Sequence, residues 1–318
     1  MPRAVSDSRS LAAAGATPAS GSPAGSGGSA PPGSGGSGAA PEAPSTPASP
    51  PPSSKGAAAP SEAIPQPVLT LEPLVEGVLL RRYKRFLADV ELPGGEVVTA
   101  HCPNTGPMTG VLHPGGRVRL RHAPDPGRKL AWTWEQAECA GADGQPVWVG
   151  VNTALPNRLV RATIEAGCLE PWLGPIAAIR AEVPYGRERR SRIDLLLTPA
   201  AGAPDQRPIY VEVKNTTWMQ GDRALFPDTV TERGQKHLEE LIHLLPAARP
   251  VLLPCLSRAD AARFAPGDSA DPRYGELFRR ALAAGVAVLP CRFAFSATEV
   301  SWLGVAAVEE HQPPLTPT

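Results

Sequence analysis

The chain of 318 residues balances 31 basic against 31 acidic side chains, which excludes a polycation that binds nucleic acid by net charge alone. Its five cysteines are odd in number and include no CxxC pair, which argues against a disulfide framework or zinc knuckle and for thiols in a reducing, cytoplasmic compartment. No run of about 18 apolar residues is present, so we expect no transmembrane helix and no membrane partner.

Residues 1–66 are mainly Ala, Gly, Ser, Pro and Thr, and none of them is aromatic. Such a segment cannot bury enough apolar surface to offset the entropy lost on ordering, so we predict a disordered low-complexity tail. Its apolar stretch is too short and too weak for a secretion signal. A transit peptide and translation from an upstream start codon are the alternatives for this segment.

Residues 67–152 contain five strand-like runs separated by turn sequences rich in Gly, Pro and Asp. In the third run Val118 and Leu120 alternate with arginines, so we expect the two apolar side chains to face inward and the arginines outward. Five short antiparallel strands predict a small all-β domain, an OB-like barrel. The predicted strands are 77–92, 96–102, 116–123, 129–139 and 146–152.

Residues 153–318 change to a mixed α/β pattern, in which strands alternate with helices that pack on a sheet. The first predicted helix covers 155–169, with Asn157 as a plausible N-cap and Gly167 as the stop. The later predicted helices are 231–245 and 271–286, and the predicted strands are 179–186, 191–198, 208–214, 250–256 and 286–295.

Two of these apolar strands carry charges in their middle, and burying an unpaired charge is costly. Because side chains alternate along a strand, Glu212 and Lys214 share one face, and Asp194 can join them if the two strands pair. Two carboxylates suit Mg²⁺ or Mn²⁺, and the ammonium can neutralise charge that develops on a phosphate. Asp, a gap and Glu-x-Lys form the minimal site of PD-(D/E)xK nucleases, with Ile193 where the motif name has proline. The alternative is a solvated, mutually screened pair.

Titratable side chains gather on both sides of this motif in the sequence, which favours phosphate chemistry. Arg187 and Arg192 precede Asp194 closely and are predicted to contact DNA, with a solubilising edge as the alternative. Beyond Lys214, a predicted loop and helix start supply further groups. These groups are Asp228, Glu232, Arg233, Lys236 and His237, of which Arg233 is also predicted to contact DNA.

The first domain carries a cluster of cations around an aromatic residue, followed by Phe86. OB barrels bind strands by stacking bases on aromatic rings within a basic groove. The alternatives are that the rings belong to the barrel core, and that the "PNTG" loop caps its own backbone. The predicted DNA contacts of this domain are Arg82, Tyr83, Lys84, Arg85, Asn104 and Thr105.

Several blocks of the sequence resemble the sugar fermentation stimulation protein A family, in matching order from about residue 73 to about residue 303. They include "HCPNTGPMTG", "SRIDLLL", "VEVKN", "FPDTVTERGQKHLEEL" and "DPRYGELF". Thr229 and Pro107 are small departures from the family pattern. The resemblance implies an OB-like domain before a PD-(D/E)xK nuclease-like domain, non-specific DNA binding and a link to sugar (maltose) metabolism. By motif matching it also implies metal ligation by Asp194 and Glu212, with Lys214 orienting water.

Three functions follow as hypotheses. The first is a Mg²⁺- or Mn²⁺-dependent nuclease that cuts phosphodiester bonds of single- or double-stranded DNA. The second is a non-catalytic DNA-binding regulator that retains the nuclease fold as a scaffold. The third is a sugar- or nucleotide-binding protein that uses the mouth of the barrel.

Overall fold

The computed structural model describes residues 64–125, 127–186 and 191–312. The tail predicted over 1–66 therefore lies, up to residue 63, outside the described residues, as does Arg187. In the described ranges no helix is long and apolar enough to cross a membrane.

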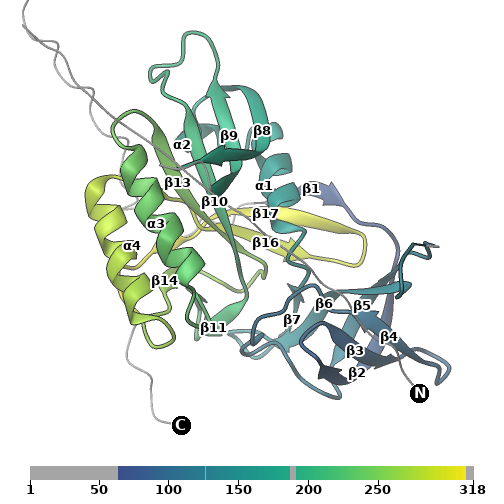
Figure 1. Ribbon diagram of the computed structural model, residues 1–318. Helices are drawn as coiled ribbons and strands as arrows, with labels where there is room; N and C mark the ends of the chain where they lie inside the picture. Colours follow the sequence, from purple (N-terminus) through teal and green to yellow (C-terminus); the bar gives the residue numbers. More distant parts are fainter. Residues whose placement is uncertain (1–63, 126, 187–190, 313–318) are drawn as a thin grey trace, which may run out of the picture. The chain divides into compact units, whose positions relative to one another are not determined.

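The largest sheet carries the two strands that hold the predicted catalytic residues (Figure 1). Its order is β1-β17-β16-β13-β10-β9-β8, and β15 pairs with β13 off this path. β10 pairs parallel with β13 and antiparallel with β9, so it lies inside the sheet. The strands are β1 (Gln66–Thr70), β8 (Ile176–Tyr185), β9 (Ser191–Pro199), β10 (Ile209–Thr216), β13 (Arg249–Leu256), β15 (Ala287–Val288), β16 (Cys291–Phe295) and β17 (Glu299–Val305).

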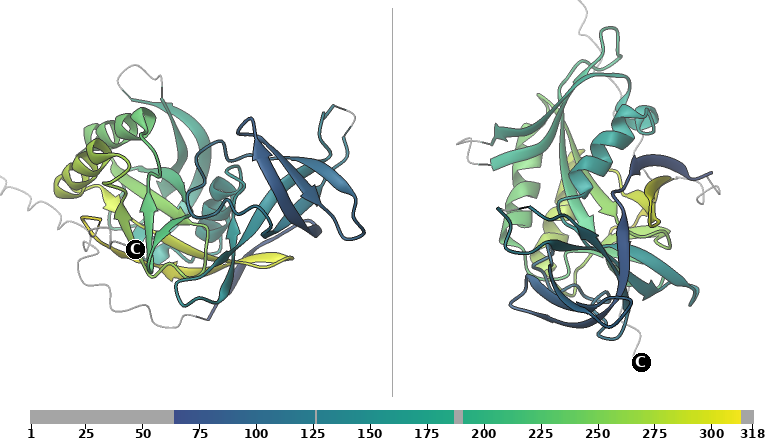
Figure 2. Two further views of the ribbon diagram at one scale, coloured as in Figure 1. Left: turned by 90° about the horizontal axis from the view of Figure 1, so that it is seen from below. Right: turned by 90° about the vertical axis from the view of Figure 1, so that its right-hand side faces the viewer.

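Helices cover both faces of this sheet, and alternation along β10 decides which residue meets which helix (Figures 1 and 2). Val211 and Val213 pack in the core beneath α1, whereas Tyr210 packs with the helices on the other face. Glu212 therefore faces α3. The helices are α1 (Pro156–Glu165), α2 (Glu170–Leu173), α3 (Glu232–Leu244) and α4 (Pro272–Ala284).

The first domain is a sheet in the order β4-β3-β2-β5-β6-β7, with a further parallel pairing between β4 and β6. Val118 and Leu120 are buried in its core as predicted, and Trp134 is fully buried as well. The strands are β2 (Leu74–Tyr83), β3 (Leu87–Glu91), β4 (Val97–His101), β5 (Arg117–His122), β6 (Trp132–Ala140) and β7 (Pro146–Gly150).

Several features differ from the sequence prediction, and the single strand predicted over 286–295 is divided into β15 and β16. The single strand predicted over 77–92 is wrong, because a turn at residues 84–86 divides it into β2 and β3. The predicted loop after β10 contains a short hairpin that belongs to a separate small sheet, and β1 pairs with β17 rather than with the barrel. The strands of the small sheet are β11 (Trp218–Gln220), β12 (Arg223–Phe226), β14 (Arg263–Pro266) and β18 (Ala307–Val308).

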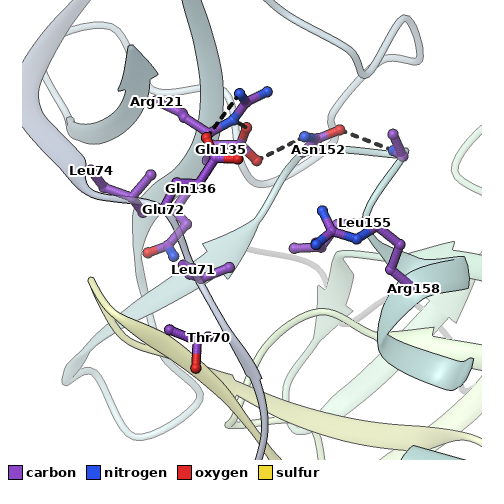
Figure 3. A pocket seen from close by; sticks show the side chains of 11 residues that line it. Thr70, Leu71, Glu72, Leu74, Arg121, Glu135, Gln136, Asn152, Leu155 and Arg158 are labelled. Atoms are coloured by element: carbon purple, nitrogen blue, oxygen red, sulfur yellow. Dashed lines mark hydrogen bonds and ion pairs between the residues drawn. The ribbon is translucent and has the colours of Figure 1, made fainter. Parts of the chain in front are cut away.

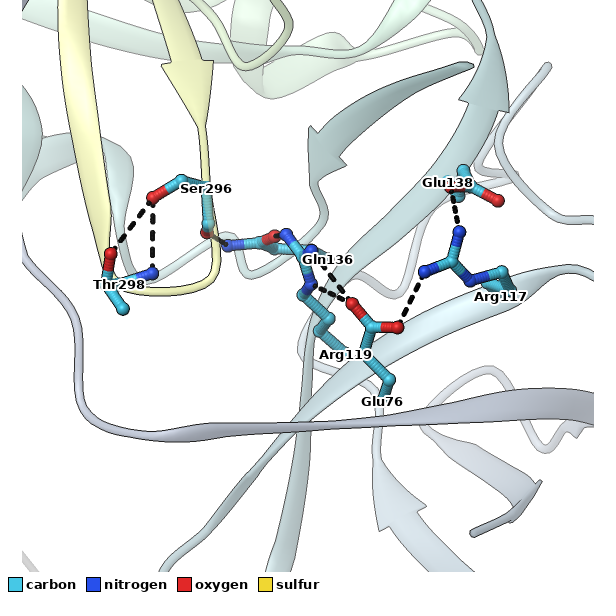
Figure 4. A network of polar contacts seen from close by, with 7 residues as sticks. All are labelled: Glu76, Arg117, Arg119, Gln136, Glu138, Ser296 and Thr298. Carbon is cyan, nitrogen blue, oxygen red and sulfur yellow. Dashed lines mark hydrogen bonds and ion pairs between the residues drawn. The ribbon is translucent and has the colours of Figure 1, made fainter. Parts of the chain in front are cut away.

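Arg119, which was predicted to face outward from the barrel core, is nevertheless buried. Its guanidinium binds Glu76 at 2.9 and 3.0 Å and lies 3.6 Å from the ring centroid of Trp148. It also donates to Gln136 Oε1 at 3.1 Å, and the Gln136 amide donates to the Ser296 carbonyl at 2.7 Å (Figure 4). The network thus connects the first domain to the β16–β17 turn of the large sheet.

We expect Arg119→Met to lower the free energy of unfolding by about 2 kcal/mol, because charge-assisted hydrogen bonds and a stacked cation are lost together. Urea denaturation measures the change. Arg117 is the matched control, because its side chain is 51% exposed and its ion pairs lie at the surface. Arg117→Met should cost less than about 1 kcal/mol, and equal effects from the two variants would contradict the role assigned to burial.

Candidate active site

Glu212, Lys214 and His237 form a buried polar cluster between β10 and α3. Lys214 Nζ donates to Glu212 Oε1 at 2.6 Å, as the shared strand face predicts, and His237 Nδ1 contacts the same oxygen. His237 Nδ1 also lies 3.0 Å from Lys214 Nζ. The Glu212 and Lys214 side chains are 3% and 12% exposed, so this cluster is largely shielded from bulk water.

Glu212 has one carboxylate oxygen that the fold leaves unsatisfied. In the part of the chain that the structure describes, Oε2 is buried and has no hydrogen-bond partner. Tyr185 Oη and Tyr274 Oη are buried and unpartnered as well, and burial together with the charge of Glu212 raises the pKa of both phenols. A buried oxygen without a partner is costly, which makes this atom a position where a bound cation or water would be stabilising.

Asp194 lies where the pairing between β9 and β10 stops. The antiparallel register ends with Leu195 opposite Val211, and the Val213 amide then donates to Asp194 Oδ2 at 2.8 Å. Asp194 Oδ1 accepts from Asn157 Nδ2 at 2.9 Å. Asn157 is thus inside α1 and not its cap as predicted, since the N-cap position is Leu155, which makes no side-chain cap hydrogen bond.

The two carboxylates are electrostatically coupled. Burial, reinforced by the negative charge of Glu212, raises the pKa of Asp194, although the Val213 amide and Asn157 act in the opposite direction. Burial would also raise the pKa of Glu212, but its contacts with His237 and Lys214 outweigh burial and lower it. The structure therefore brings Glu212 and Lys214 into direct contact, while Asp194 joins them through the Val213 amide and through its charge.

The cations predicted beside the site have different positions. Arg233 is exposed in the first turn of α3, and its Nε lies 3.4 Å from His237 Nε2. Arg192 is exposed on β9, with Nη1 3.5 Å from the Glu182 carbonyl. Of these two arginines, Arg233 is thus the one that extends the Glu212–His237 cluster toward solvent.

The barrel residues predicted to contact DNA divide into structural and exposed groups. Arg82 Nη2 donates to the Arg85, Asn104 and Gly106 carbonyls at 2.6, 2.8 and 2.9 Å, so it holds a turn and a loop together. Lys84 and Phe86 are exposed, which excludes Phe86 from the barrel core. Their turn is free to meet a ligand.

The remaining predicted contacts also make internal hydrogen bonds. Tyr83 Oη donates to Asp89 Oδ1 at 3.1 Å, and Arg85 Nε donates to the carbonyl of exposed Thr105 at 2.9 Å. Asn104 Oδ1 accepts from the Gly106 amide at 2.9 Å, which is the backbone-capping alternative. These hydrogen bonds order the loop, and because Arg85 donates to a neutral carbonyl its positive charge is not neutralised.

A cavity of about 220 Å³ at the start of α1 contains none of the predicted site residues. Glu135 accepts from Arg121 Nε at 3.0 Å and from Asn152 Nδ2 at 2.7 Å, and Asn152 Oδ1 accepts from the Ala154 amide at 3.0 Å (Figure 3). These hydrogen bonds join Arg121, Glu135 and Asn152 to one another.

Sequence reasoning missed Asn157 as a partner of Asp194, and it named His237 only among the titratable groups beyond Lys214, without pairing it with Glu212. Asn157 carried only a local capping signal, whereas its contact spans 37 residues of chain. His237 could have been singled out, because it lies four residues beyond Arg233 on one face of a predicted helix.

Family models define the chain as a two-domain protein with an OB domain followed by an RE domain. Residues 80–151 match the SfsA N-terminal OB domain, and residues 154–299 match the sugar fermentation stimulation protein RE domain. The chain belongs to the sugar fermentation stimulation protein family, which confirms the resemblance noted from the sequence and the OB assignment.

Similar proteins support this membership. A sugar fermentation stimulation protein homolog of Synechococcus sp. (strain RCC307) is 75% identical over 242 residues, which cover 76% of this chain and 96% of the relative. The homolog of Parasynechococcus marenigrum (strain WH8102) is 71% identical over 255 residues, covering 80% and 99%. The solved structure of Pyrococcus furiosus SfsA in complex with Ca²⁺ has a TM-score of 0.66 at 26% identity, covering 77% of this chain and 99% of that chain.

Proposed function

We propose that this protein binds DNA and hydrolyses phosphodiester bonds at a PD-(D/E)xK nuclease-like site formed by Asp194, Glu212 and Lys214, with Mg²⁺ or Mn²⁺ as cofactor. The observation that carries the proposal is the buried, unpartnered Oε2 of Glu212 beside Lys214. The Ca²⁺ complex of the Pyrococcus relative supports a divalent cation in this fold.

The donor set fits a hard cation that takes one or two carboxylates and completes its shell with water and substrate phosphate. Glu212 offers an oxygen without a partner, and each Asp194 oxygen accepts one N–H and retains further acceptor capacity. A bound divalent cation would polarise a phosphoryl oxygen and lower the pKa of a bound water.

The remaining roles belong to side chains of this chain. Lys214, held by Glu212, supplies positive charge for the phosphate. Asn157 and the Val213 amide fix the orientation of Asp194, and His237 fixes that of Glu212. Arg233 offers an exposed cation at the start of α3, where the helix dipole also favours an anion.

A non-catalytic DNA-binding regulator is the second candidate, and three observations favour it. Both Asp194 oxygens are already engaged, and the Glu212 side chain is only 3% exposed. In residues 64–125, 127–186 and 191–312, no three Asp, Glu, His or Cys side chains are grouped so that they could hold a metal ion by themselves.

Incubation of plasmid and single-stranded DNA with purified protein and Mg²⁺ or Mn²⁺ separates the two candidates. The nuclease proposal expects cleavage that EDTA abolishes and added metal restores. DNA binding without cleavage under any of these conditions would establish the regulator instead.

The exposed turn at Lys84 provides a test of DNA binding that does not depend on catalysis. Because each neutralised phosphate releases counterions, Lys84→Ala should reduce the slope of log affinity against log salt by about 0.9 on duplex DNA. Fluorescence anisotropy with EDTA present measures that slope. Arg280→Ala, at an exposed cation of α4, should leave the slope unchanged, and a salt-independent affinity of the wild type would refute DNA binding.

A further inference from the structure

A second cavity lies where loops of the OB domain meet the end of β10, and no function has been assigned to it above. Its volume is about 220 Å³. The barrel contributes Asn104, the segment between β7 and α1 contributes Thr153, and β10 with the following hairpin contributes Asn215, Thr217 and Trp218. Asp228, two residues beyond β12, also lines the cavity.

Hydrogen bonds hold the walls of this cavity in place. They occupy the side-chain oxygens of Asn104 and Asn215 and leave the amide N–H groups of both side chains available as donors. Ser257 Oγ donates to Asn215 Oδ1 at 2.6 Å, and the Gly106 amide donates to Asn104 Oδ1 at 2.9 Å. In the part of the chain that the structure describes, neither Asn104 Nδ2 nor Asn215 Nδ2 donates a hydrogen bond. Thr153 Oγ1 donates to the Pro103 carbonyl at 3.0 Å, which joins the segment before α1 to the barrel loop that carries Asn104.

The charge of the lining selects the chemistry of an occupant. Among the residues that the structure describes, no Lys or Arg lines this cavity and Asp228 is its one charged residue, so a phosphate would be repelled. Two amide donors and a carboxylate acceptor match the donor and acceptor edge of a nucleobase, since an amide N–H can donate to a ring nitrogen or carbonyl oxygen of a base, and Asp accepts from an amino group such as that of cytosine. Trp218 and Phe226 supply aromatic walls, on which bases stack.

Cations of the neighbouring turn contact the loop that forms one wall. Arg82 binds the Asn104 carbonyl and Arg85 binds the Thr105 carbonyl, and Lys84 is exposed between them. A strand can therefore place phosphates on this turn while one base enters the cavity. The volume lies below the range of about 300–1,000 Å³ of drug-sized pockets, which suits one base rather than a longer segment.

We propose that this cavity binds a single unstacked nucleobase, supplied by the DNA strand on which the proposed function acts. The source of the base rests on that proposed function, whereas the chemistry of the cavity does not. Extruding a base from a duplex costs a few kcal/mol, so the cavity favours single strands and mismatches.

Titration with the four free deoxynucleosides, followed by ligand-observed NMR, tests the cavity without phosphate or cleavage. We expect at least one deoxynucleoside to bind with a dissociation constant of about 1 mM. Thr153 lines the cavity, so Thr153→Trp should partly fill it and weaken deoxynucleoside binding at least about tenfold. Thr229→Trp is the matched control, because Thr229 is exposed next to Asp228 but does not line the cavity, and it should bind as the wild type does.

The outcomes separate the cavity from the proposed function. If wild-type protein binds DNA but no deoxynucleoside, or binds glucose in place of deoxynucleosides, the nucleobase cavity is overturned while DNA binding stands. If a deoxynucleoside binds and Thr153→Trp abolishes its binding, the cavity is supported even where no DNA is cut. A wild-type titration in which no deoxynucleoside binds overturns the proposal without any variant. A thermal melt checks that Thr153→Trp folds.

Discussion

Glu212→Gln is expected to lower the rate of metal-dependent DNA cleavage by at least about 10²- to 10³-fold. The substitution keeps the size of the side chain but removes the charge of the unpartnered Oε2, the atom best suited to hold a cation. Single-turnover cleavage of labelled DNA in Mn²⁺ measures the rate, and calorimetry of Mn²⁺ binding should show a parallel loss of affinity. Asp194→Asn should act in the same direction.

Glu276→Gln is the control for this experiment, because Glu276 lies exposed on α4 and pairs only at the surface with Arg273. Its rate and metal affinity should match the wild type. Cleavage by Glu212→Gln at the wild-type rate would place the chemistry elsewhere. Loss of DNA binding in Glu212→Gln, together with loss of cleavage, would point to a folding defect, which a thermal melt detects.

Much of the central site followed from strand periodicity. Alternation along β10 put Glu212 and Lys214 on one face, and the structure brings their charged atoms to 2.6 Å. Strand alternation does not show which helix covers this face. The contact of His237 with Glu212 could therefore not be predicted without the packing of α3 on the sheet. The partner of Asp194 was equally hidden, because a side-chain amide that reaches across 37 residues leaves no local pattern.

The turn at residues 84–86 shows a second limit of sequence reasoning. Hairpin positions with positive φ are usually marked by Asn or Gly, but in this three-residue loop Lys84 and Arg85 adopt φ of 49° and 66°. The hydrogen bond from Arg82 Nη2 to the Arg85 carbonyl at 2.6 Å helps to offset the cost of this conformation. The run of cationic residues was therefore predicted as part of one continuous strand, although a hydrogen bond from one of its own side chains stabilises the turn.

Arg119 shows that alternation predicts direction but not exposure. Its side chain points away from the barrel core as expected, yet Trp148 and the β16–β17 turn cover it. A sequence reveals which residues share a face, and it does not reveal which other element lies over that face. The same limit applies to the nucleobase cavity, whose walls come from four separate segments.

Asp271→Ala is expected to lower the free energy of unfolding by about 3 kcal/mol, because it removes a cap and leaves buried donors unpaired. Asp271 is 1% exposed and accepts from the Tyr274 amide at 3.0 Å at the start of α4. It also accepts from the Thr231 amide at 2.9 Å and from Gln235 Nε2 at 3.0 Å, at the start of α3. One carboxylate thus fixes the starts of both helices, including the helix that carries His237.

Urea denaturation of Asp271→Ala measures the loss, and Asp143→Ala is its control. Asp143 is exposed and caps a surface turn by accepting from the Gln145 amide, so its removal should cost less than about 1 kcal/mol. Similar losses from both variants would contradict the assignment of Asp271 as a buried double cap.

The pH dependence of Asp271→Ala provides an independent check. Burial alone would raise the pKa of Asp271, but hydrogen bonds from the Thr231 and Tyr274 amides and from Gln235 outweigh burial and lower it below 3.8. A carboxylate with a lowered pKa in the folded state stabilises fully above its unfolded pKa and loses this contribution as the pH falls through the folded value. The difference in stability between wild type and Asp271→Ala should therefore be constant from pH 5 to 7, as estimated with an unfolded pKa of about 3.9, and should shrink below that pKa. A difference that grows on acidification would show that the carboxyl is protonated in the folded protein and that it does not cap the two helices as an anion.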